Sequence, residues 1–156
     1  MLPPLDPGRL KAANINPATG LATDYLNHYN EIAMTIASLA DIPEMREEVL
    51  GWRPVGYPAH FLRTRYADQG LAIAGYIAAP RDVKAQFLAA RAELDSRLTA
   101  LQARIAAADG SPGSLGAEAD AIFADIARLG GIINGGRSAS LLERSAEQDL
   151  VDSFFP

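Results

Sequence analysis

The strongest indication of the fold class comes from residues 81–108, RDVKAQFLAARAELDSRLTALQARIAAA. The apolar side chains of this stretch recur at steps of three or four residues, which places them on one face of an α-helix. These side chains are Val83, Phe87, Ala90, Leu94, Leu98, Leu101 and Ile105. A helix with such a stripe has to bury it against other elements. The stretch therefore predicts one long amphipathic helix that needs packing partners.

Three further segments show helical periodicity, at about 20–40, at 58–79, and around a stripe that runs from Ala119 to Ile133. A short helical turn is expected at 44–50, and the Gly- and Pro-rich run at 51–60 predicts a loop. No segment shows the alternation of a half-buried strand. Four long amphipathic helices joined by short loops predict an all-α protein, an antiparallel four-helix bundle.

The length of 156 residues is typical of one domain. We expect residues 1–18 to form an irregular, Pro-rich arm and residues 19–136 to form the helical-bundle domain. Residues 137–156 are expected to form a helical or extended C-terminal tail.

The composition is that of a globular protein, because 49% of the residues are hydrophobic and 21% are charged. The net charge of −5 argues against direct binding of nucleic acid. Without cysteine, the chain forms no disulfide and offers no thiolate ligand or nucleophile. Prolines interrupt the N-terminus where a signal peptide needs an apolar core, and no apolar run is long enough for a membrane span. We therefore expect a cytoplasmic protein that does not bind membranes.

The segment TDYLNHYNE contains a first group of residues that could carry chemistry. Asp24, His28 and Glu31 are spaced i, i+4, i+7, so they share one side of a helix, and His60 lies near the start of the helical segment at 58–79. Two histidines and two carboxylates are suitable ligands for a divalent metal, or groups for acid–base chemistry. The alternative is a boundary histidine at His28 that is held by its helical neighbours.

Two arginines in HFLRTRY form a second candidate group. Arg63 and Arg65 lie beside aromatic residues and are able to bind a phosphate or a carboxylate. Alternatively, they pair with the acidic residues of the EMREE segment. The glycine-rich runs lack the strand, helix and lysine of a phosphate-binding loop, and no catalytic set is evident. We therefore predict no cofactor and no enzymatic activity.

The C-terminal segment QDLVDSFFP, 148–156, is unusually apolar for a chain end. Val151, Phe154 and Phe155 are spaced i, i+3, i+4, so a helix here would present a narrow apolar ridge. A helix of this kind docks into a groove of a partner or packs on its own domain. The expected partner-contacting residues are Gln148, Leu150, Val151, Phe154 and Phe155.

The same segment resembles two families of docking peptide. QDLVDSFF is similar to the acidic, apolar peptides by which bacterial flagellar-switch and chemotaxis phosphatase proteins hold the chemotaxis response regulator. It also resembles the sliding-clamp box, Gln-x-x-aliphatic-x-x-aromatic-aromatic, with Gln148, Val151, Phe154 and Phe155 in the four roles. These resemblances imply a response-regulator-like or clamp-like partner, and a homodimer in which the tail packs on a sister subunit is the alternative.

The sequence as a whole predicts a non-catalytic adaptor that docks a protein partner through its tail. The alternative function is that of a helical bundle that binds a metal or a small ligand through Asp24, His28, Glu31 and His60.

Overall fold

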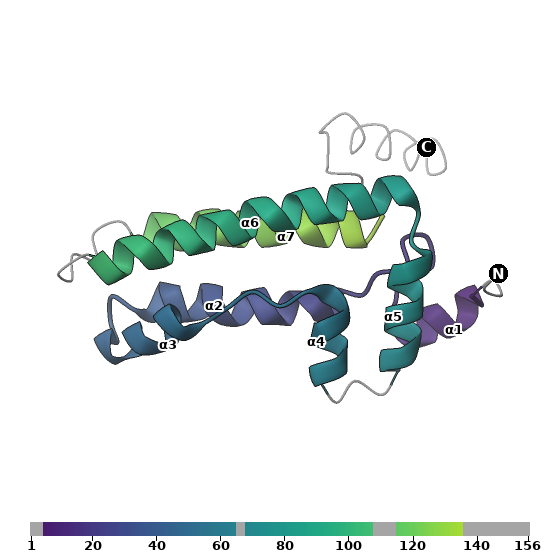
Figure 1. The fold of residues 1–156 in the computed structure, drawn as a ribbon, viewed down its shortest axis with the longest axis horizontal. Helices are drawn as coiled ribbons and strands as arrows, with labels where there is room; N and C mark the ends of the chain where they lie inside the picture. Colours follow the sequence, from purple (N-terminus) through teal and green to yellow (C-terminus); the bar gives the residue numbers. More distant parts are fainter. Residues whose placement is uncertain (1–4, 65–67, 108–114, 136–156) are drawn as a thin grey trace, which may run out of the picture.

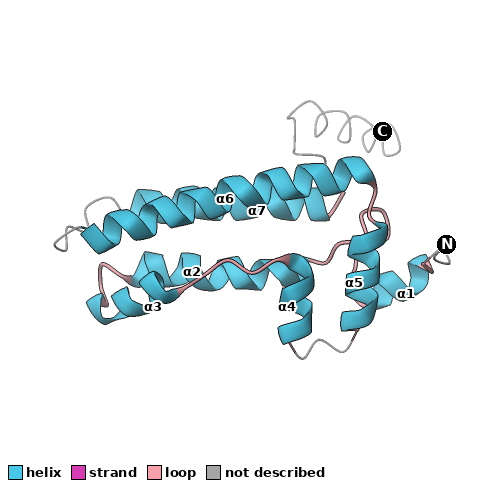
Figure 2. Ribbon diagram, in the orientation of Figure 1, coloured by secondary structure: helices cyan, strands magenta, loops and turns pink. Residues whose placement is uncertain are grey.

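The structure is a computed structural model that describes residues 5–64, 68–107 and 115–135. In these ranges the chain consists of helices and loops (Figure 2). One isolated β-bridge joins Ile15 and Ala22. The predicted all-α class is therefore confirmed. None of the helices in the described ranges has the length and apolar character that crossing a membrane would require.

The two longest helices, α6 (Arg81–Ala107) and α7 (Leu115–Ile133), run antiparallel and side by side (Figure 1). The predicted stripe of α6 is buried from Phe87 to Ile105. Ion pairs flank this apolar contact, and their order along the two helices agrees with the antiparallel arrangement. The pairs are Arg97–Asp125, Arg104–Glu118 and Glu93–Arg128.

The remaining long helix, α2 (Asn27–Ser38), follows the 3₁₀ turn η1 (Thr23–Leu26) and packs on α7. After the 3₁₀ turn η2 (Pro43–Met45), the short helix α3 (Arg46–Gly51) contacts both α2 and α6. These contacts arrange α2, α7, α6 and α3 in a ring, and α3 has only six residues. An antiparallel bundle of four long helices is not confirmed.

The segment predicted as one helix at 58–79 forms two short helices, α4 (Tyr57–Arg63) and α5 (Gln69–Ala78). Both lie across the direction of the long helices (Figure 1). Helix α4 ends because Thr64 has extended backbone angles, φ −89° and ψ 163°. The prediction of a single helix is wrong here, since the apolar periodicity of the segment is too irregular for one continuous buried stripe.

Part of the predicted irregular arm is a helix, α1 (Pro7–Ala12). Asp6 caps it by accepting a hydrogen bond from the N–H of Gly8, and proline occupies its first position, where no N–H is needed. Leu10 and, just after the helix, Ala13 and Ile15 are buried in the core. A six-residue helix is unstable alone, so the burial of these side chains explains why α1 forms.

The segment from Asn14 to Gly20 is held between α5 and the end of α7. Gly20 has φ +76° and meets Gly75 of α5 so closely that a Cβ on Gly75 would lie 2.5 Å from the carbonyl oxygen of Gly20. The buried Thr19 hydroxyl donates to the carbonyl of Ile133 at 2.6 Å. These contacts fix the N-terminal segment against the rest of the fold.

Candidate functional site

A cleft with a volume of about 850 Å³ lies between α2, α4 and the segment that follows α3. This volume is within the range of small-ligand pockets. We call it the histidine cleft; its polar and aromatic lining includes His28, Glu31, Trp52, Arg53, His60, Arg63 and Thr64. Four residues that the sequence singled out in two separate groups therefore line one cleft, namely His28, Glu31, His60 and Arg63.

His28 holds one wall of the cleft in place. Its Nε2 accepts a hydrogen bond from the N–H of Val55 at 3.0 Å, and its ring stacks on Trp52 with 4.7 Å between ring centroids. Burial, with a smaller contribution from the nearby His60, lowers the pKa of His28 to about 4. The imidazole is therefore neutral at pH 7 and serves as an acceptor that anchors the segment after α3.

His60 is only 7% exposed and is oriented by a carboxylate. Its Nε2 lies 3.1 Å from Oδ2 of Asp24, and the other oxygen of Asp24 accepts from Nδ2 of Asn27 at 3.2 Å. An ionised carboxylate only accepts hydrogen bonds, so Nε2 of His60 donates. Asp24 therefore fixes the ring of His60, whose centroid is 6.5 Å from that of His28.

The four proposed metal ligands do not gather into a metal-binding group. Across the described residues, no three His, Cys, Asp or Glu side chains come close enough to hold a metal ion. Nε2 of His28 is occupied by the N–H of Val55, and Nε2 of His60 by Asp24. The histidines instead act as parts of the cleft wall.

Three hydrogen-bond donors on the lining of the cleft lack a partner in the described part of the chain. The exposed guanidinium of Arg63 makes no hydrogen bond or ion pair there, and Nε1 of Trp52 and Oγ1 of Thr64 are buried without one. A buried polar group without a partner costs about 1–3 kcal/mol. Donors of this kind in one cleft suit a ligand that accepts hydrogen bonds.

Hydrogen bonds from two sides support the segment between Trp52 and Val55. The hydroxyl of Tyr25 donates to the carbonyl of Val55 at 2.6 Å. From α6, Nε2 of Gln102 donates to the carbonyls of Val49 and Trp52, both at 2.8 Å. These hydrogen bonds therefore hold the wall of the cleft in place although it has no regular secondary structure.

Tyr29 connects this support to α6. Its hydroxyl donates to Oδ1 of Asp95 at 2.7 Å, and the other oxygen of Asp95 pairs with Arg91. Burial raises the pKa of Tyr29 far above its usual value, so the hydroxyl stays protonated and remains a donor.

Sequence reasoning missed Trp52, Arg53 and Thr64. A signal for the first was present, because Trp52 is the single tryptophan of the chain and lies in a run rich in glycine and proline. An aromatic residue in a loop that has no periodic stripe to join is a reasonable binding-site candidate.

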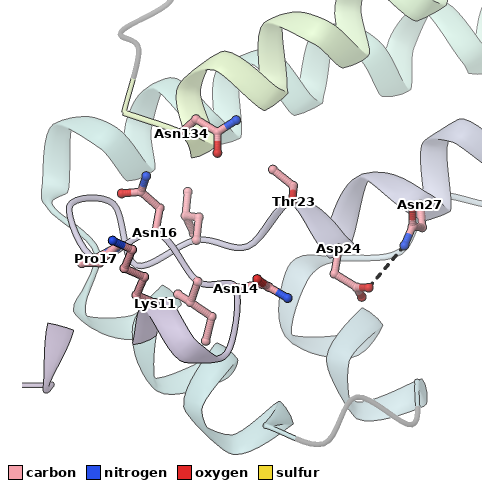
Figure 3. Close-up of a pocket in the computed structure, with 10 residues that line it drawn as sticks. Lys11, Asn14, Asn16, Pro17, Thr23, Asp24, Asn27 and Asn134 are labelled. Atoms are coloured by element: carbon pink, nitrogen blue, oxygen red, sulfur yellow. Dashed lines mark hydrogen bonds between the residues drawn. The ribbon is translucent and has the colours of Figure 1, made fainter. Parts of the chain in front are cut away.

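A second hollow, of about 670 Å³, was also missed. It lies between the segment after α1, η1 and the end of α7 (Figure 3). We call it the asparagine pocket; its polar lining consists of Lys11, Asn14, Asn16, Thr23, Asp24, Asn27 and Asn134. Asn27 lines both hollows, and the Asp24–His60 hydrogen bond connects them.

Several predicted residues lie outside the described ranges. Arg65 of the anion-binding group is one of them. The predicted docking residues of the tail are the others: Gln148, Leu150, Val151, Phe154 and Phe155. The predictions about these residues stay predictions.

No protein-family model, no curated protein and no solved structure matches this chain. Its function is therefore argued from the geometry of the described residues.

Proposed function

We propose that the protein binds a small organic anion in the histidine cleft. The observation that carries this proposal is the set of unpartnered donors on the lining: the guanidinium of Arg63, the indole N–H of Trp52 and the hydroxyl of Thr64. Carboxylate and phosphate oxygens accept hydrogen bonds from all three kinds of donor. The proposal develops the ligand-binding alternative predicted from the sequence, with an anion in place of a metal.

The charges around the cleft favour the same ligand class. Arg53 and Arg63 both line it, whereas Glu31 is the one acidic residue on the described lining. Arg53 already donates to the carbonyls of Leu50 and Trp52, at 2.8 and 2.7 Å, so its charge is held near the wall. Because His28 is neutral at pH 7, the two arginines give the lining a positive balance.

The walls of the cleft are prepared for binding before a ligand arrives. Asp24 fixes His60, and Val55 and Trp52 fix His28. A ligand therefore loses little affinity to the ordering of these side chains.

The test is isothermal titration calorimetry with citrate, benzoate and inorganic phosphate. At least one of these probes is expected to bind the wild-type protein. Arg63→Met should weaken that binding about tenfold or more, because it removes a charge-assisted donor. The control is Arg81→Met, which removes an exposed arginine at the start of α6, outside the cleft, and should leave the affinity unchanged.

Arg63 has no described partner, so Arg63→Met should melt at the wild-type temperature. Absence of binding by all three probes would contradict the proposal. So would equal affinities of the wild type and Arg63→Met.

Docking through the tail is an independent proposal that rests on the sequence of residues 148–155 alone. Its test is a pull-down of a purified chemotaxis response regulator and a purified sliding clamp, with wild type and a Phe154→Ala/Phe155→Ala variant. Retention of either partner by the wild type and its loss with the variant would support docking. If the wild type retains neither the response regulator nor the sliding clamp, both partner classes are rejected.

Light scattering at two concentrations tests the predicted homodimer. The cytoplasmic location also stays a prediction.

A further inference from the structure

The asparagine pocket carries two opposite charges on different sides. Lys11, on α1, makes no ion pair with any described residue, and Asp24 belongs to η1. In Figure 3, Lys11 and Asp24 lie at opposite sides of the hollow, with Asn14 between them. A ligand that spans the hollow therefore meets a cation at one side and a carboxylate at the other.

Asp24 retains capacity to accept hydrogen bonds. One of its oxygens accepts from Asn27 and the other faces His60. An ionised carboxylate has about four lone-pair sites, so about two remain available. An ammonium group is a suitable donor to these sites.

Side-chain amides line the hollow between the two charges. The side-chain amides of Asn14 and Asn134 line the pocket and make no hydrogen bond to any described residue. Oδ1 of Asn16 accepts from the N–H groups of Ala18 and Thr19, which leaves its NH₂ group as a donor. These amides offer both donors and acceptors to a polar ligand.

The pocket also has an apolar part, formed by Ile15, Pro17 and Leu21. No aromatic side chain belongs to the described lining, so a sugar ring would have no stacking surface. The volume of about 670 Å³ is within the range of small-ligand pockets.

We infer that the asparagine pocket is a second binding site, for a zwitterion with a peptide group between its two charges, such as a dipeptide. Lys11 and amide NH₂ groups bind the carboxylate, and Asp24 with amide oxygens binds the ammonium group. Asn14 and Asn134 contact the polar groups between the two charges. The inference does not depend on the anion in the histidine cleft, because Lys11, Asn14 and Asn134 line the asparagine pocket and do not line the histidine cleft.

The test uses L-alanyl-L-alanine and L-alanyl-L-glutamine as probes in isothermal titration calorimetry with the full chain. The N-acetyl derivative of each probe lacks the ammonium group, and the methyl ester lacks the carboxylate. We expect at least one unmodified probe to bind and both of its blocked derivatives to bind about tenfold or more weakly, because each loses a charge-assisted contact.

Lys11→Met should weaken the binding of the zwitterion about tenfold. The variant should leave the affinity for the methyl ester unchanged, since the ester has no carboxylate for Lys11 to bind. The matched control is Arg9→Met on the same helix, outside the pocket, which should bind as the wild type does. Arg63→Met should also leave zwitterion binding unchanged, which separates this site from the histidine cleft.

Asn134→Ala is a second variant for the same site and should lower the binding affinity of the unmodified probe. Three outcomes would overturn the inference: no binding of either probe at about 10 mM, equal binding of a probe and its blocked derivatives, or equal affinities of the wild type and Lys11→Met.

Discussion

The helical pair α6–α7 and the region formed by residues 5–64 share one apolar core but differ in the polar contacts that supplement it. The pair is joined by an apolar stripe, in which Leu94 and Leu98 are fully buried, with ion pairs at its edges. In residues 5–64, side chains bind backbone groups across long distances in the sequence, as Thr19 does with Ile133 and Tyr57 with Ala22.

Both proposed binding sites are built largely from residues 5–64. A regular helix uses its backbone N–H and C=O groups internally and gives its apolar face to the core. An irregular segment needs side chains to fix it, and those side chains form walls around hollows. The regular helices of this chain therefore supply much of the shared core, and the irregular segments that rest on it supply the walls of the proposed sites.

The largest expected effect is in the helical pair. Leu98→Ala removes a fully buried side chain from α6 and should lower the free energy of unfolding by about 2–5 kcal/mol. Urea denaturation measures this loss. The control Leu88→Ala, on the same helix but 40% exposed, should cost less than about 1 kcal/mol. If the folded Leu98→Ala protein also lost affinity for the anion, the geometry of the histidine cleft would depend on the packing inside the helical pair.

The next effect concerns the contact between Gly20 and Gly75. Gly20→Ala combines a left-handed backbone with a clash against the carbonyl of Gly75, so it should cost about 2–4 kcal/mol in urea denaturation. The matched control is Gly70→Ala at the start of α5, where a Cβ meets nothing within 4 Å. That variant should be neutral or slightly stabilising. Equal stability of the two variants would show that the N-terminal segment is not held as described.

The smallest effect is the pH dependence that His28 introduces. Its pKa is about 4 in the folded protein and 6.5 ordinarily, so the unfolded chain binds the proton more readily. The stabilisation is fully present above pH 6.5 and is lost as the pH falls towards 4. We expect a loss of about 1–2 kcal/mol between pH 7 and pH 5, a value reduced because solvent reaches part of the ring.

Urea denaturation at the two pH values, on wild type and on His28→Gln, measures this effect. Glutamine does not titrate, so the variant should lack the part of the pH dependence that His28 causes. An identical pH dependence in both proteins would mean that burial does not lower the pKa of His28 in the folded protein.

The periodicity of 81–107 and the stripe from Ala119 to Ile133 predicted α6 and α7 correctly, because this signal is local. The turn before Gly51 and the loop that follows it were also predicted from local residues, although residues 57–60 of the predicted loop belong to α4. The helix α1 was missed although Asp6 and Pro7 are local start signals, because its six residues are too few to show a periodic stripe. No local stop signal marks Thr64, so the break there was not predictable from neighbouring residues.

The all-α class, the two longest helices and a set of residues with possible chemistry follow from the amino-acid sequence, because helical periodicity and residue type are read from neighbours in the chain. The folded chain is needed to see that His28 and His60 lie in one cleft, that Trp52 and Arg63 join them, and that Asp24 supports His60 instead of a metal. These relations depend on how α2, α4 and the segment after α3 pack together. Such packing is set by the shapes and hydrogen bonds of residues far apart in the chain, which no local pattern contains.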